Sequence, residues 1–261
     1  MAAAEDHLAA AEALAREIMA IGARVGLPFV AATSDIGSPR LPVGTDGRPL
    51  AETVFRWIDP ELRYWEDHGF ALRAMGIHVA RACAEPFWLA QGRFGSWRPN
   101  AALEAFSAEW PFETHGAAAC IVAPIHLPKG VIGVVIWGTP DAGFDVKAAF
   151  DAHAPQMHLL ALRFVATYED AVAGSDQAPA RLTRREIQCL KWAAAGKTDA
   201  EIAEIVAISL ATVRFHVANA ARKLSAGGRA QAVQRAAALG YIGAIPAGAA
   251  SRPTRNRPRS E

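Results

Sequence analysis

Polar and basic side chains gather on one face of an expected helix between Ser209 and Leu224, near the carboxyl end of the chain. Hydroxyl, guanidinium, imidazole, carboxamide and ammonium groups can donate to phosphate oxygens or reach the edges of nucleic-acid bases. The set comprises Thr212, Arg214, His216, Asn219, Arg222 and Lys223. Apolar residues at helical spacing mark the other face: Val213, Val217, Ala220 and Leu224. The pattern predicts a helix that packs on one side and presents nucleic-acid-binding groups on the other.

Capping signals divide the surrounding residues into four short helices. Thr183–Glu186 and Thr198–Glu201 each fit the capping box, in which two side chains satisfy free backbone N–H groups reciprocally. Residues 207–208 are expected to form a turn, Ser209 to cap the third helix, and Arg229–Leu239 to form the fourth. Two short helices joined by a tight turn make a helix-turn-helix, whose second helix can lie in the major groove of DNA.

The distribution of charge supports a nucleic-acid partner for this segment. Residues 181–242 hold ten Lys or Arg and four Asp or Glu, a net charge of +6. Residues 1–180 hold thirteen basic and twenty-one acidic residues, a net charge of −8. The near-zero total therefore hides a basic segment, and basic segments bind polyanions.

Residues 182–242 resemble the C-terminal DNA-binding domain of LuxR-type transcriptional regulators along their whole length. The family pattern has Leu-Thr-x-x-Glu, a Gly before the second helix, Thr-Val-x-x-His in the recognition helix, then Lys-Leu and an Arg before Gln-Ala-Val. The matching residues are Leu182, Thr183, Glu186, Gly196, Thr212, Val213, His216, Lys223, Leu224, Arg229, Gln231, Ala232 and Val233. Gly228 departs from a common Asn, but both residues tolerate the same turn conformation.

Ten residues are expected to contact double-stranded DNA. They are Thr198, Ser209, Thr212, Val213, Arg214, His216, Asn219, Arg222, Lys223 and Arg229. Arg222 and Lys223 lie late in the helix and are expected on phosphates, whereas His216 can support packing, touch a phosphate or read a base. Glu186 is expected to pair with a nearby Arg or to offer a surface to RNA polymerase.

The remainder of the chain is expected to form an α+β domain, an α/β/α sandwich with an antiparallel sheet, ahead of the all-α helix-turn-helix domain. Its expected helices are 5–25, 62–84, 101–108 and 146–172, the last interrupted near Pro155. Its expected strands are 28–33, 87–89, 118–125 and 131–137, of which the last two read as a hairpin. Helical layers on both sides of a small sheet can enclose a cavity for a small molecule.

The LuxR-type resemblance also suggests which residues would line such a cavity. In members that bind acyl-homoserine lactones, a Tyr, an Asp and a Trp line the pocket, and a Gly opens the hairpin region. With Trp88 as the reference, Tyr64 stands 24 residues before it and Gly116 stands 28 residues after it, as the family pattern requires. The expected ligand-binding residues are Tyr64, Arg73, Trp88, Trp57, Phe70 and Gly116.

Arg73 is the main departure from that pattern, because it stands where the family has the Asp that accepts a hydrogen bond from the ligand amide. Ala74 likewise replaces the usual Pro. A guanidinium has only donors and always carries charge, so it cannot replace that Asp. Either the ligand carries an acceptor or a carboxylate for Arg73, or Arg73 turns to solvent. The sequence therefore predicts that acyl-homoserine lactones are not recognised in the usual way.

Other functional classes find little support. A phosphorylated receiver domain needs an acidic pair after its first strand, but only Asp35 stands there. No Gly-x-Ser-x-Gly turn, phosphate-binding loop or metal-spaced pair of histidines is present, so no catalytic residue, cofactor or metal is expected. The alternatives kept open are a LuxR-type regulator that needs no ligand and a response-regulator-like protein controlled by another partner.

The expected organisation is a sensor domain at 1–172, a linker at 173–180, the helix-turn-helix domain at 181–242 and a disordered tail at 243–261. No window reads as a membrane span. Three widely spaced cysteines fit neither a disulfide framework nor a zinc site, which suits a reduced cytoplasm. The expected function is a ligand-responsive transcriptional regulator that binds DNA as a homodimer, its small molecule being of unknown identity.

Overall fold

The computed structural model describes residues 2–38, 40–59, 61–63, 66, 74–109, 111–173 and 180–243. The chain divides into two compact units, the first made of residues 1–127 and 131–176, the second including residues 177–261. Residues 174–179 of the expected linker and all of the expected tail beyond Gly243 lie outside the described residues.

A five-stranded antiparallel sheet forms the centre of the first unit, with the strand order β1-β5-β4-β2-β3. The strands are β1 (Phe29–Thr33), β2 (Phe87–Ala90), β3 (Arg93–Gly95), β4 (Ala119–His126) and β5 (Ile132–Thr139). β4 and β5 form the expected hairpin, in which Ile121 pairs with Trp137. Seven of the eight residues of β4 are buried, so this central strand is covered on both faces.

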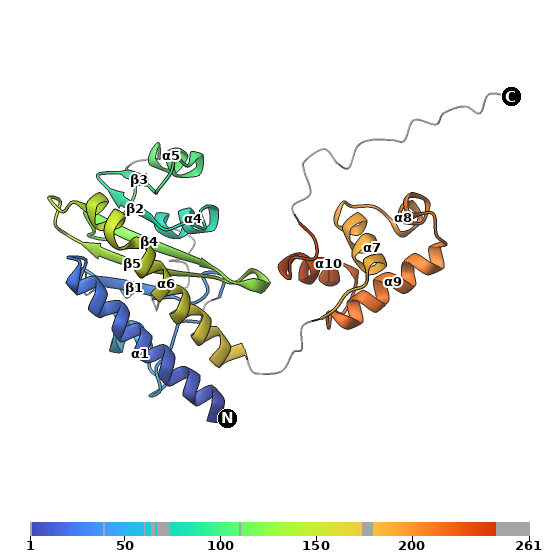
Figure 1. The fold of residues 1–261 in the computed structure, drawn as a ribbon, viewed down its shortest axis with the longest axis horizontal. Helices are drawn as coiled ribbons and strands as arrows, with labels where there is room; N and C mark the ends of the chain where they lie inside the picture. The colour runs from blue at the N-terminus through green and yellow to red at the C-terminus, as the bar shows by residue number, and fades with distance from the viewer. Residues whose placement is uncertain are drawn as a thin grey trace. The chain divides into compact units, whose positions relative to one another are not determined.

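Two long helices, α1 (Ala2–Arg24) and α6 (Val146–Ala173), pack side by side against one face of the sheet (Figure 1). Their core includes the fully buried side chains of Ile18, Trp137 and Phe150. The Trp137 indole N–H donates to the Ile18 carbonyl at 2.9 Å, which joins β5 to α1. An interruption of α6 was expected near Pro155, but the helix continues through it. Pro155 lies on the exposed side of the helix, where water can satisfy the carbonyl that the proline leaves free.

Shorter helices cover the opposite face, α4 (Met75–Ala82) and α5 (Ala101–Ser107), while α2 (Leu50–Thr53) is a single turn in the connection after β1. A second core lies between this layer and the sheet and includes Phe87, Leu89 and Val122. Asn100 caps α5 as expected, accepting from the Ala102 N–H at 3.0 Å. The sheet thus lies between two helical layers, which confirms the expected α/β/α sandwich.

The helix expected over residues 62–84 is not continuous. Leu62, Arg63 and Glu66 are not helical, and α4 begins at Met75 because Ala74 is extended with ψ of 116°. Residues 64, 65 and 67–73 lie outside the described residues. Strand β3 and the turn of α2 were not expected at all. Both are very short, and β3 exists because it pairs with β2 in the sheet rather than through any pattern of its own.

Gly133 in β5 offers a test of this packing. A Cβ atom there would lie 2.6 Å from Cγ1 of Val165 on α6 and 3.0 Å from the Ser34 carbonyl oxygen. Gly133→Ala should therefore lower the free energy of unfolding of the first unit by about 1–3 kcal/mol. Urea unfolding followed by tryptophan fluorescence reports on that unit, because six of the seven tryptophans lie in it.

Gly76→Ala is the matched control, since a Cβ on Gly76 would lie at an ordinary 3.7 Å from Ile136. Alanine also favours the helix, so this variant should unfold at the same or slightly higher urea concentration than the unmodified protein. Equal midpoints for the two variants would contradict the close packing of α6 on β5.

Candidate nucleic-acid interface and small-molecule cavity

Four short helices form the second unit: α7 (Arg184–Ala194), α8 (Asp199–Val206), α9 (Leu210–Lys223) and α10 (Arg229–Ala238) (Figure 1). Both expected capping boxes are present, at the starts of α7 and α8. Ser209 caps α9, its hydroxyl oxygen accepting from the Thr212 N–H at 3.0 Å. Each helix of the helix-turn-helix pair therefore starts at a side chain that fixes its first turn.

A three-residue turn joins α8 to α9 and depends on a left-handed residue. Ala207 has φ of 55° and ψ of 49°, a conformation that alanine adopts only when the surrounding packing holds it. That packing comes from a core that joins α7, α8 and α9 and includes Cys189, Ile202, Val213 and Val217. The core thus sets the angle at which α9 leaves α8.

Val213 was expected both in this core and at the DNA. It is fully buried, so its assignment as a DNA contact was wrong. The outward side of α9 instead carries a run of exposed or half-buried side chains. They are Ala211, Thr212, Arg214, Phe215, His216, Ala218, Asn219, Arg222 and Lys223. Phe215 was missed by the sequence reasoning, which looked for polar groups, although its position in the helix is read directly from the sequence.

Arg229 was expected at the DNA, but its guanidinium holds α10 to the start of α8. One nitrogen donates to Asp199 Oδ1 at 2.8 Å, and the other donates to the Lys197 carbonyl. Only 35% of its side chain is exposed. These contacts use two of the five N–H donors of the guanidinium and hold it against α8, so Arg229 has a role within the fold.

Lys223 also bonds within the unit, because its ammonium donates to Glu186 Oε2 at 2.9 Å. Glu186 was expected to pair with an Arg, so its actual partner corrects that expectation. Burial raises the pKa of the Glu186 carboxyl, but the hydrogen bonds from Thr183 and Lys223 outweigh burial and leave the pKa below its usual value. Glu186 is 3% exposed, and its carboxylate joins α7 to the end of α9.

Two arginines of α9 keep their guanidinium groups at the surface. Arg222 donates to the Asn219 carboxamide oxygen at 3.0 Å, which orients it along the helix. Arg214 lies 3.8 Å from Asp199 Oδ2, a loose ion pair at the limit of contact, and 69% of its side chain is exposed. Thr198 and Ser209, also expected at the DNA, are exposed at the starts of α8 and α9, where their hydroxyls serve as caps.

A small apolar cavity lies in the first unit between the sheet and the layer that contains α4. The described residues enclose about 60 Å³, and the lining includes Ala31, Trp57, Met75, Phe94 and Ile136. Its polar side chains come from the loop before β4, at residues 113–115. The indole of Trp57 donates to the His115 carbonyl at 2.8 Å, so the tryptophan is fixed as part of the wall.

Only some of the ligand-binding residues expected from the sequence lie at this cavity. Trp57 lines the cavity, and Gly116 follows the lining residue His115 with φ of 84°. Trp88 points to the opposite face of the sheet, where it packs over Gly95 and the core beneath α1 and α6, so its assignment to the cavity was wrong. Successive strand residues face opposite sides, and Leu89 is the β2 residue on the cavity side. Tyr64, Phe70 and Arg73 lie outside the described residues.

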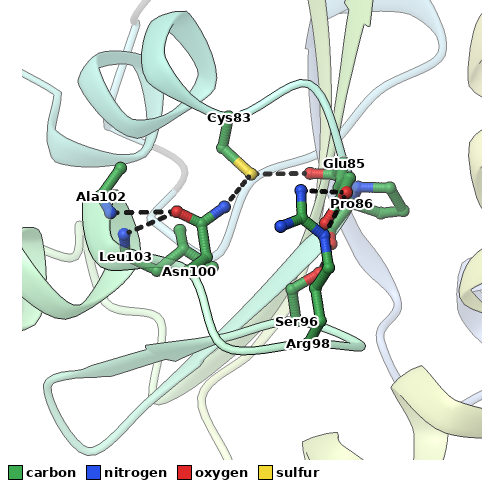
Figure 2. A network of polar contacts seen from close by, with 8 residues as sticks. All are labelled: Cys83, Glu85, Pro86, Ser96, Arg98, Asn100, Ala102 and Leu103. Atoms are coloured by element: carbon green, nitrogen blue, oxygen red, sulfur yellow. Dashed lines mark hydrogen bonds and ion pairs between the residues drawn. The ribbon is translucent and has the colours of Figure 1, made fainter.

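Figure 2 shows a polar network that joins the loop between α4 and β2 to the segment between β3 and α5. The Asn100 amide donates to Cys83 Sγ at 3.5 Å, and the Cys83 thiol donates to the Glu85 carbonyl at 3.3 Å. Arg98 Nε donates to the Glu85 carboxylate at 2.8 Å. Burial raises the pKa of the Cys83 thiol, which therefore stays protonated and serves as a link in the fold.

Comparison with known proteins supports this description of the second unit. Residues 180–236 match the family of bacterial regulatory proteins called the luxR family. The second unit therefore contains a luxR-family helix-turn-helix domain, and the resemblance inferred from the sequence is confirmed there. In the part of the chain that the structure describes, no helix is long and apolar enough to cross a membrane.

Curated relatives carry the names of transcription regulators. The chain is 37% identical over 134 residues to the transcriptional activator protein VanR of Vibrio anguillarum, covering 49% of this chain and 53% of VanR. The quorum sensing-dependent transcriptional regulator VjbR of Brucella ovis is also 37% identical over 134 residues, half of each chain. The regulator RpaR of Rhodopseudomonas palustris is 53% identical over 62 residues, 24% of this chain and 26% of RpaR. The chain thus spans about half the length, or less, of these relatives.

Among solved structures, SdiA in complex with octanoyl-rac-glycerol aligns over 90% of this chain and 91% of its own. The TM-score is 0.45 and the sequence identity is 20%.

The pair between Lys223 and Glu186 predicts a pH-dependent stability. The pKa of Glu186 is lowered in the folded state, so its stabilisation is present above its usual pKa of 4.5 and is lost as the pH falls through the folded value. Lys223→Met leaves the buried carboxylate without its cation and should destabilise the second unit by about 1–3 kcal/mol at pH 7. As the pH falls below the lowered pKa and Glu186 becomes protonated, the variant and the unmodified protein should converge.

Thermal unfolding of the full chain, followed by helical circular dichroism from pH 7 downwards, measures this difference. Lys191→Met, which removes an exposed lysine from α7, is the matched control and should leave the melting curve unchanged. An unaltered melting temperature for Lys223→Met at pH 7 would contradict the assigned role of this ion pair.

Proposed function

We propose that this protein is a transcription regulator that binds double-stranded DNA through α9 and responds to a small molecule held in the first unit. The exposed basic and polar side of α9, on a capped helix-turn-helix within the residues that match the luxR family, is the observation that carries the proposal. The names of VanR, VjbR and RpaR support the same function. In this proposal the protein acts in the cytoplasm, where it can reach DNA.

In this proposal α9 lies in the major groove, with its first two turns over the base edges and its end beside the backbone. Thr212, Arg214, His216 and Asn219 supply hydrogen-bonding groups for the bases. Arg222 contacts a phosphate. The chain acts as a homodimer, because two recognition helices can then meet half-sites about one DNA turn apart. A small molecule that binds one dimeric arrangement better than another changes how the helices fit those half-sites.

Two arginines of the second unit separate DNA contact from folding. Arg222→Ala should leave stability unchanged, but it should weaken binding to all duplexes and reduce the slope of log affinity against log salt by about one. Arg229→Ala should destabilise the unit, because it removes the contacts with Asp199 and the Lys197 carbonyl. Fluorescence anisotropy with genomic duplex fragments over a range of salt, together with melting curves, measures both effects.

If Arg222→Ala and Arg229→Ala lowered stability equally, the assignment of Arg222 to DNA contact and of Arg229 to folding would be contradicted. An unmodified protein that binds no duplex at low salt would overturn the proposed function itself.

The cavity of the first unit favours an apolar ligand, because its described lining is almost entirely hydrocarbon and aromatic. Arg73 stands where the lactone-binding members have an acceptor, so the proposed ligand carries an acceptor or a carboxylate of its own. A shift between dimeric arrangements needs only that the ligand binds one of them more tightly than the other.

Ala31→Leu tests the cavity, since Ala31 lines it from β1 and a larger side chain would fill the space. Native mass spectrometry of the freshly purified full chain should show a small molecule retained by the unmodified protein and lost by this variant. Ala105→Leu, on the exposed side of α5, should retain it. Retention by Ala31→Leu would contradict the cavity as the site, and retention of an acyl-homoserine lactone would contradict the inference from Arg73.

A further inference from the structure

Phe215 is the most exposed large hydrophobic side chain among the described residues, with 61% of its surface open to solvent. Its ring meets the neighbouring His216 ring edge-on, with centroids 5.8 Å apart and an angle of 65° between the planes. Single exposed hydrophobic residues are common on protein surfaces, so exposure alone explains nothing. The position of Phe215 on α9 is what requires an explanation.

Phe215 lies at the centre of the outward side of α9. A helix turns by about 100° per residue, so Phe215 points away from the stripe of Val213, Val217 and Ala220 that packs in the core. It is the sixth residue of α9, in the half of a recognition helix that faces base edges. Arg222, two turns later, falls on the same line along the helix.

The residues around Phe215 allow a close approach to DNA. Ala211 lies four residues before it and Ala218 three residues after it, and both are exposed. Their methyl side chains let the helix surface come near the base edges beside the phenyl ring. Arg214 directly precedes Phe215 on one flank, where its guanidinium can reach a base edge, and Arg222 lies two turns further along the same line, where its guanidinium can reach a phosphate.

We propose that Phe215 is a specificity-determining residue that contacts the C5-methyl group of thymine in the major groove. This inference rests on the proposed DNA-binding function. A phenyl ring cannot bind phosphate or donate to a base, whereas the thymine methyl is the apolar group that the major groove presents. The contact buries hydrocarbon on both sides, so it favours thymine over bases that lack the methyl group at that position.

The test uses the full chain and can begin before any operator has been identified. Duplexes enriched by the unmodified protein from a random-sequence library are resynthesised with uracil in place of each thymine in turn, which removes one methyl group and leaves the base pairing intact. Affinity at fixed salt should fall about fourfold at one or more thymines in each half-site, the change expected for burial of one methyl group.

Phe215→Ala should bind the thymine and uracil duplexes equally at those positions. Arg222→Ala is the control, because it should bind both more weakly while keeping the fourfold ratio. Phe215→Leu, which keeps an apolar side chain, should keep part of the ratio. Melting curves of all variants should match, since the phenyl ring is largely outside the core.

Two results would overturn the inference while leaving DNA binding intact. The first is an unmodified protein whose affinity is indifferent to every thymine-to-uracil change, a result that depends on no variant. The second is a Phe215→Ala protein that retains the full ratio. A failure of the unmodified protein to enrich any duplex would instead count against the proposed function, so the two failures are distinguishable.

Discussion

The second unit depends on one constraint, which is that α9 must bury one stripe of side chains while leaving the other side free. Val213, Val217 and Ala220 supply the buried stripe, and α7, α8 and α10 surround it. The apolar core of the second unit is small, so the capping residues and the left-handed Ala207 also help to set the angle of α9. Because the buried stripe and the capping residues hold α9 in place, the side chains on its outward side remain available for contacts with other molecules.

Several basic side chains of the second unit make contacts within the fold. Arg229 and Lys223 are bound to acidic and carbonyl oxygens, and Arg235 donates to the carbonyl of Leu224 at 2.6 Å. The Lys223 ammonium and the Arg235 guanidinium lie at the carboxyl end of α9, where free carbonyl groups favour positive charge, whereas Arg229 joins the start of α10 to the start of α8. Arg214 and Arg222 keep their guanidinium groups on the outward side of α9, so they are available to the proposed interface.

In the first unit the two-residue period of a strand decides which side chains can meet a ligand. Leu89 faces the cavity, while Trp88 beside it packs over Gly95 on the other face. The register that the family resemblance suggests for Trp88 therefore does not place its ring in the cavity. The wall is instead built from Trp57, Phe94 and Ile136, which come from three separate segments of the chain.

The sequence by itself determined what depends on neighbouring residues: both capping boxes, the cap at Ser209, the hairpin of β4 and β5, and the buried stripe of α9. It also determined the α/β/α class, through the order of its elements. Only the tertiary structure decided which charges pair, because Lys223 and Glu186 lie 37 residues apart and Arg229 and Asp199 lie 30 apart. The same holds for β3 and for the direction of Trp88. Local signals act within a turn or two of chain, whereas ion pairs, edge strands and cavity walls are selected by packing between distant segments.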